Sequence, residues 1–320
     1  MSIHDSCGKE FPHDHTFIQL VNKGGTCYIN SVLQSLFNIP SIMNFIWEYY
    51  HIVNDLSLLN EGEKYPLGFF SKIFVDSLNA PQNEVLYEPN YFLDSIFKST
   101  ALFHPNECSD ATEFFMFIAG SFEKTINILN NMNPNCKIPS FQQLFETRIS
   151  SLITNESGYS HTLNETFLLC PIQLSPGNTY TSLWNWLSPE DVGSSTIIRE
   201  FNHLPFILSF QIGIFYVDPN NFNASKIRNK MEIPISLGLR DEKGDKDYDL
   251  ISAVFHLGNK IDDGHYVAIV TACKRWFLCD DTNIKPLSDD DVFEILVNNQ
   301  IPGCNECSAY MLFYQQAGVA

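Results

Sequence analysis

The sequence predicts an α+β fold, with a helical lobe followed by an antiparallel sheet. Apolar residues, many of them Phe, recur at helical spacing from about Thr26 to Met132. From about Phe145 onward the chain changes to β-branched and aromatic runs that are typical of strands. With 320 residues, 44% of them hydrophobic, the chain can bury one large core or the cores of two lobes. We therefore expect helices packed against a sheet, with a functional site in a cleft between the lobes.

The first predicted helix begins at a cysteine. Gly24 and Gly25 form a turn before Cys27, and Pro40 ends the segment. One apolar helical face lies between these points, formed by Ile29, Val32, Leu33, Leu36 and Phe37. A helix N-terminus favours negative charge, so Cys27 is placed to act as a thiolate nucleophile. Taken alone, however, the segment is more typical of a small buried cysteine.

A further helix is predicted to begin at Asp110. Aspartate followed three positions later by Glu113 is a helix-capping pattern, and an apolar face continues from Phe114 to Phe122. Capping alone explains both acids, although capping and a binding role can coexist.

Near the end of the chain, two strand-like runs separated by residues 273–274 predict an antiparallel hairpin. With a two-residue turn, His265 shares a face with Asp280 as a diagonal neighbour, whereas Asp281 points the other way. His265 would then be a general base toward Cys27, with Asp280 fixing its ring. A bulge or a longer turn would exchange the two aspartates. Taken alone, His265 also fits a hydrogen-bonded histidine in a sheet, and Asp280 and Asp281 also fit a solvated turn.

In the order Cys, His, Asp, these segments resemble the ubiquitin-specific protease family of deubiquitinating cysteine proteases. Asn22–Leu36 is similar to the family's cysteine box, and Ile251–Thr282 is similar to its histidine box. Leu204–Gln211 and Ser308–Tyr314 are similar to two strands of its palm. The resemblance runs through most of the chain and implies a papain-like fold with a helical thumb, an antiparallel palm sheet and short fingers.

The resemblance also implies domain boundaries. Residues 1–15 would be an N-terminal tail, and 16–316 would be the catalytic domain. Within that domain, the thumb would span about 16–140, the fingers about 145–200 and the palm about 201–316.

The resemblance adds site residues. Asn22 matches the residue whose side-chain amide stabilises the oxyanion, although it also fits an ordinary turn asparagine. Asp110 and Glu113 match part of the family's acidic box, which contacts the ubiquitin tail, and Tyr266 is implied as a further substrate-binding residue.

The sequence departs from the family pattern at two places. Cys108 and Ser109 stand where the family usually has glutamine, which puts in doubt how tightly this wall holds the tail. The fingers contain Cys170 but no paired cysteines, so we expect them to be zinc-free, and we expect neither a metal nor a cofactor elsewhere. The lone Cys304–Cys307 pair is read as turn packing rather than a metal site.

Composition bounds the partners and the compartment. With 37 acids against 19 bases, the chain lacks the clustered cations that nucleic acid requires, and a basic protein tail suits it better. Nine scattered cysteines indicate reduced thiols, so we expect a cytoplasmic or nuclear protein. No signal-peptide core or membrane-spanning run is visible, and we expect no membrane partner. The acidic run 241–249 is expected to be a solvated loop, and Asp289–Asp291 a loop or a helix start.

The sequence and the resemblance together predict a deubiquitinase that cleaves the isopeptide or peptide bond after the C-terminal glycine of ubiquitin. Cys27, His265, Asp280 and Asn22 would be catalytic, ubiquitin and ubiquitinated proteins would be the partners, and a monomer is favoured. Two alternatives stay open. One is a catalytically weak ubiquitin-binding protein of the same fold, and the other is a thiol peptidase for a ubiquitin-like modifier.

Overall fold

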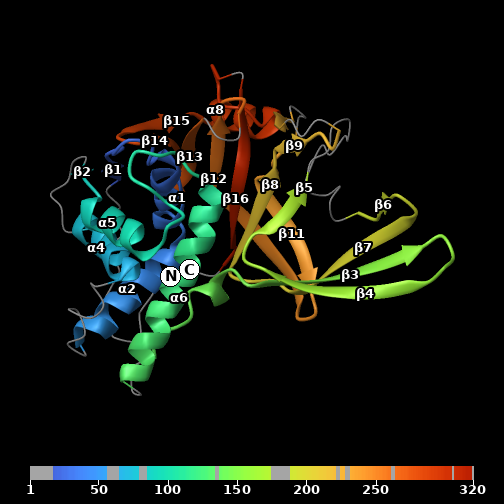
Figure 1. Ribbon diagram of the computed structural model, residues 1–320, viewed down its shortest axis with the longest axis horizontal. Helices are drawn as coiled ribbons and strands as arrows, with labels where there is room; N and C mark the ends of the chain where they lie inside the picture. Colours follow the sequence, from blue (N-terminus) through green and yellow to red (C-terminus); the bar gives the residue numbers. More distant parts are fainter. Residues whose placement is uncertain are drawn as a thin grey trace. The chain divides into compact units, whose positions relative to one another are not determined.

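A computed structural model describes residues 17–55, 65–78, 85–133, 137–173, 188–220, 224–227, 231–260, 264–304 and 306–318 (Figure 1). The predicted tail at residues 1–15 lies outside these ranges. The chain divides into two compact units. The first consists of Met1–Gln142 and His265–Leu287 with Ala320, and the second of Gln143–Gly264 and Ser288–Val319. The boundaries expected for thumb, fingers and palm stay a prediction.

The first unit contains the predicted helices and three consecutive antiparallel strands. Its described helices are α1 (Cys27–Phe37), α2 (Pro40–Asp55), α4 (Pro66–Leu78), α5 (Asn90–Ser99) and α6 (Ala111–Met132). The antiparallel strands are β13 (His265–Ala272), β14 (Arg275–Asp280) and β15 (Asn283–Leu287). A separate parallel pair is formed by β1 (Ile18–Leu20) and β2 (Val85–Tyr87).

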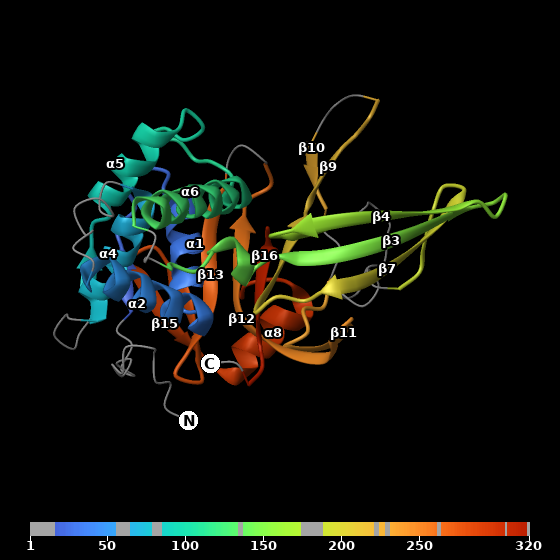
Figure 2. The same cartoon turned by 90° about the horizontal axis from the view of Figure 1, so that it is seen from below.

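Helix α1 lies at the centre of this unit, where it packs against α2, α6 and strand β13 (Figure 2). All 11 of its residues are buried. Phe-rich faces fill the space around it, with Phe37 stacked on Phe70 at 4.7 Å between ring centroids and Phe70 4.9 Å from Phe122. Because this helix is enclosed on every side, its polar side chains need hydrogen-bond partners within the protein rather than in water.

The second unit is mainly β-structure. One sheet contains β12 (Gly244–Leu257), β16 (Cys307–Gln316), β8 (Ile207–Gly213) and β5 (Cys170–Gln173), with β11 (Ser236–Asp241) paired to β12. The expected antiparallel pairing is confirmed for these pairs except β5–β8, which is parallel. The unit also contains the β9 (Phe215–Val217) and β10 (Ala224–Lys226) hairpin and helix α8 (Asp289–Asn298).

A second sheet projects from this unit in the order β4-β3-β7-β6 (Figure 1). Its antiparallel strands are β4 (Ser160–Phe167), β3 (Thr147–Asn155), β7 (Ser195–His203) and β6 (Glu190–Val192). This sheet occupies the residues that the sequence assigns to the fingers, and the short 3₁₀ turn η1 (Gln142–Leu144) precedes it.

The two acidic runs of the sequence adopt different structures. The run 241–249 is not a loop, because β11 and β12 pair up to Asp241 and Gly244 and leave a tight turn between them. Asp241, which was expected to be solvated, is buried. Its carboxylate lies 2.8 Å from the Lys246 ammonium, with which it forms an ion pair. Asp289–Asp291 open α8, in which Ser288 and Asp291 form a capping box.

Candidate active site

The glycine turn before α1 has the backbone geometry that only glycine adopts easily. Gly24 and Gly25 have φ values of 86° and 78°, in the left-handed region. A Cβ on Gly25 would lie 2.8 Å from the carbonyl carbon of Glu107 and 3.0 Å from the backbone nitrogen of Cys108. The turn therefore fits closely under the segment before α6, and it delivers Cys27 to the first position of α1 as predicted.

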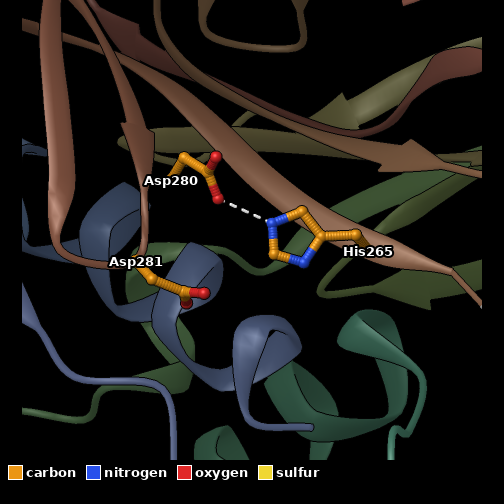
Figure 3. Close-up of side chains that lie close together, drawn as sticks. All are labelled: His265, Asp280 and Asp281. Carbon is orange, nitrogen blue, oxygen red and sulfur yellow. Dashed lines mark hydrogen bonds and ion pairs between the residues drawn. The ribbon is translucent and has the colours of Figure 1, made fainter.

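His265 and Asp280 are hydrogen-bonded, with 2.6 Å between Nε2 and Oδ1 (Figure 3). Nε2 faces the carboxylate, and Cys27 is close enough to the imidazole to affect its charge. The pKa of His265 is raised to about 10, first by the hydrogen bond to Asp280 and next by the interaction with Cys27, while burial opposes the shift. The same pairing lowers the pKa of Asp280. These groups form a charged pair beside the thiol.

The register of the β13–β14 hairpin explains why Asp280 meets the histidine. Ala272 pairs with Arg275, and the two turn residues, Cys273 and Lys274, have positive φ values of 49° and 62°. Positive φ at both positions gives the twist that joins strands through two residues. The predicted two-residue turn is therefore confirmed, and so is the diagonal contact that was derived from it.

The alternation of strand side chains predicted that Asp281 points away from His265 and Asp280. The structure shows that it does not, because its carboxylate lies near both. It follows the end of β14 with a φ of 53°, and this left-handed turn conformation interrupts the alternation. Its carboxylate oxygens accept from Nδ2 of Asn22 at 2.9 Å and from Nδ2 of Asn30 at 2.7 Å. Figure 3 shows both carboxylates on the same side of the histidine ring, with Asp281 below Asp280 in this view.

Asn22 is fixed at both ends of its amide. Its Oδ1 accepts from the backbone nitrogens of Gly24 and Thr26, each at 3.1 Å, and Nδ2 donates to Asp281. Because these partners identify the oxygen and the nitrogen, the amide has one orientation. An amide nitrogen carries two hydrogens, and Asp281 uses one of them.

Asn30, on the second turn of α1, was not among the predicted site residues. A search for an apolar stripe does not single out a polar residue within it. The pair Asn30 and Gln34, four positions apart in a helix buried on all sides, is the signal that could have identified it.

The predicted substrate-binding residues occupy three different environments. Asp110 caps α6, since its Oδ1 accepts from the backbone nitrogens of Thr112 at 2.7 Å and Glu113 at 3.0 Å. Capping is therefore confirmed. Glu113 is exposed on the first turn, and Tyr266 is buried in β13. Their contacts with ubiquitin stay a prediction.

The metal-binding potential of the described residues is limited to one cluster. Ligand atoms of His265, Asp280 and Asp281 lie within 4.8 Å of one another, although each already has a hydrogen-bond partner. At the lone cysteine pair, Cys307 Sγ accepts from the backbone nitrogen of Ile301 at 2.9 Å and donates to the carbonyl oxygen of Cys304 at 3.4 Å. Those contacts agree with the interpretation of this pair as turn packing.

The fold and this thiol–imidazole–carboxylate group define a cysteine hydrolase, and comparison with known proteins identifies its family. The model of the ubiquitin carboxyl-terminal hydrolase family matches residues 18–314. The chain belongs to this family. The predicted family resemblance is confirmed, and so is the predicted enzyme class, a ubiquitin hydrolase of the cysteine type.

Two relatives and one solved structure illustrate the range of similarity. The chain is 25% identical over 308 residues to probable ubiquitin carboxyl-terminal hydrolase 8 of Schizosaccharomyces pombe, spanning 92% of this chain and 64% of that protein. It is 22% identical to ubiquitin carboxyl-terminal hydrolase 4 of Arabidopsis thaliana, spanning 97% of this chain and 96% of that protein. The structure of the SAGA Ubp8/Sgf11/Sus1/Sgf73 DUB module bound to ubiquitin aldehyde aligns with a TM-score of 0.74 at 21% identity, covering 94% of this chain and 70% of that chain. The likeness to that structure confirms the predicted fold.

Proposed function

We propose that this chain hydrolyses the isopeptide or peptide bond after the C-terminal glycine of ubiquitin, with Cys27 as the nucleophile. The observation that carries the proposal is the His265 ring, which is hydrogen-bonded to Asp280 through Nε2 and whose pKa is raised by Asp280 and by the nearby Cys27. In a chain of this family, such an arrangement supports thiolate attack on the scissile carbonyl.

The proposed reaction has two halves. The Cys27 thiolate adds to the carbonyl carbon, and the oxyanion that forms accepts a hydrogen bond from the second Nδ2 hydrogen of Asn22. His265, charged near neutral pH because its pKa is raised, donates its proton to the leaving amine. The C–N bond breaks, which leaves ubiquitin attached to Cys27 as a thioester. Water then attacks the thioester carbonyl and His265 accepts its proton. The C–S bond breaks, which releases the ubiquitin carboxylate and regenerates the Cys27 thiolate.

The two aspartates would have separate tasks in this reaction. Asp280 holds the histidine ring and stabilises its charge, whereas Asp281 orients the oxyanion donor through the bond to Asn22. The substrate-side residues Asp110, Glu113 and Tyr266 would contact the ubiquitin tail. A net charge of -18 favours encounter with a basic tail, which the family resemblance ascribes to ubiquitin.

A cytoplasmic or nuclear location is part of the proposal. It is supported by the seven cysteines in the described ranges, all of which are free. None of the described helices is long and apolar enough to cross a membrane. Imaging of a fluorescently tagged chain would test the location.

The test of function is turnover of ubiquitin carrying a fluorogenic amide at its C-terminus. We expect turnover by the wild-type chain and none by Cys27→Ala. Tight ubiquitin binding without turnover would instead favour the catalytically weak alternative, which is suggested by Cys108 and Ser109 at positions where the family usually has glutamine. Turnover of a ubiquitin-like modifier but not of ubiquitin would favour the third interpretation.

A further inference from the structure

Helix α1 buries two amide side chains one turn apart, and they differ in what they contact. Asn30 and Gln34 are 1% and 2% exposed. Both donate to carbonyl oxygens of strand β1, Asn30 to Leu20 at 3.3 Å and Gln34 to Ile18. Asn30 alone also donates to Oδ1 of Asp281, at 2.7 Å.

The orientation of the Asn30 amide follows from its neighbours. A backbone carbonyl and a carboxylate are both acceptors, so only the NH₂ group can face them. The Asn30 Oδ1 is then left buried without a hydrogen-bond partner among the described residues. An unsatisfied buried oxygen destabilises a fold. Asn30 is therefore poorly suited to a purely structural role.

Asn30 instead restrains Asn22, the proposed oxyanion donor, through two hydrogen bonds. It holds the carbonyl of Leu20, two residues before Asn22 in the chain, which fixes the backbone. It also holds Asp281, whose other oxygen accepts from the Asn22 side chain at 2.9 Å. One buried amide thus restrains both the main chain and the side chain of Asn22.

We propose that Asn30 is a positioning residue for the oxyanion donor, acting on Asn22 through Asp281 and through the chain at Leu20. The inference rests on the proposed function and adds a residue that does not itself touch substrate. Removing Asn30 leaves Asp281 with one amide donor and lets its carboxylate rotate. The Asn22 amide then loses its fixed direction, and stabilisation of the transition state is lost while binding of the substrate is retained.

The first test compares Asn30→Ala with Gln34→Ala, since Gln34 binds the same strand without touching Asp281. Two affinities are measured for each variant. One is for ubiquitin aldehyde. Cys27 adds to its carbonyl carbon, and the carbonyl oxygen then occupies the oxyanion position. The other is for ubiquitin, measured in a Cys27→Ala background. We expect Asn30→Ala to lower kcat and the aldehyde affinity about 10- to 100-fold with little change in ubiquitin affinity or KM.

Gln34→Ala is expected to lower the melting temperature but to preserve the ratio of the two affinities. If Asn30→Ala behaves in the same way, Asn30 has only a structural role and the inference is overturned. If the wild-type chain turns over no ubiquitin amide and gains no affinity from the aldehyde group, the proposed function and this inference fall together.

A reciprocal pair keeps the inference testable even if Asn30→Ala does not fold. Asn30→Asp places two carboxylates together, whereas the double variant N30D/D281N restores one hydrogen bond with donor and acceptor exchanged. In that variant the oxygen of the new amide still accepts from Asn22. We expect the double variant to recover at least about tenfold in kcat over Asn30→Asp. Simple additivity of the two substitutions would overturn the inference.

Discussion

His265 is the residue whose charge state the structure defines most clearly. Its pKa is raised from 6.5 to about 10, with the Asp280 hydrogen bond as the largest cause. A raised folded-state pKa means that the charged ring stabilises the fold fully below pH 6.5. This stabilisation is lost as the pH rises toward about 10. The imidazolium required for proton donation should therefore persist well above neutral pH.

Asp280→Asn should move the alkaline limb of the kcat/KM profile to lower pH, because it removes the largest contribution that keeps His265 protonated. Initial rates on a ubiquitin fluorogenic amide between about pH 6 and 11 would measure the shift. Asp245→Asn, at an exposed carboxylate, is the control and should leave the limb in place. An unmoved limb in Asp280→Asn would mean that another group controls the histidine.

Asp281→Asn should lower kcat without moving the alkaline limb, because this residue contacts Asn22 and Asn30 rather than the histidine. An amide at position 281 offers one oxygen to two amide donors, so one of the two bonds is lost. We expect a smaller loss of turnover than in Asp280→Asn. A larger loss, or a shifted limb, would mean that Asp281 is the partner that holds the imidazole during catalysis.

At the scale of elements, the glycine turn and α1 together bring the nucleophile to its position. The turn is tight because the segment before α6 lies directly against it. Any side chain on Gly25 must displace backbone atoms of residues 107–108, and backbone moves less readily than a flexible side chain.

Gly25→Ala should destabilise the protein by at least about 1 kcal/mol and greatly reduce turnover, since it combines a positive φ with a close backbone contact. Gly120→Ala is the matched control. Gly120 lies within α6 with open space where a Cβ would go, so alanine there should stabilise the protein by about 0.5–1 kcal/mol. Thermal melts and turnover would measure both. Equal melting temperatures for the two variants would contradict the close-contact argument.

The sequence was sufficient to predict elements whose geometry repeats regularly. Strand alternation and a two-residue turn gave the contact of His265 with Asp280, and helix signals gave the position of Cys27. Asp281 could not be predicted in the same way, because one residue with positive φ redirected its side chain. Asn30 was missed since its role depends on Leu20 and Asp281, which are 10 and 251 positions away. Contacts of that kind depend on packing between elements.

At the scale of the whole molecule, the sheet in the finger region is held by strand pairing and by contacts between its turns. The backbone nitrogen of Glu156, after β3, donates to the carbonyl oxygen of Ser194, before β7, at 3.1 Å. Two residues of this region have side chains that could bind zinc, Cys170 and His161. The cysteine is buried in β5, whereas the histidine is exposed on β4. Residues 174–187, which the sequence also assigns to the fingers, lie outside the described residues.

We expect chelation to leave the melting temperature and turnover unchanged, because a structural zinc requires about four N or S ligands in one cluster. The measurement is a thermal melt with and without a strong chelator, paired with elemental analysis of the washed protein. One stoichiometric zinc whose removal lowers the melting temperature would overturn the prediction of zinc-free fingers.

The central claim is that Cys27 is the nucleophile of a ubiquitin hydrolase. Its most direct test is labelling with ubiquitin that carries an electrophile in place of its C-terminal carboxylate, followed by peptide mapping. The account predicts one adduct, at Cys27, absent from Cys27→Ala and strongly reduced in His265→Ala. An adduct at an exposed cysteine such as Cys108 or Cys273, or undiminished labelling of Cys27→Ala, would contradict it.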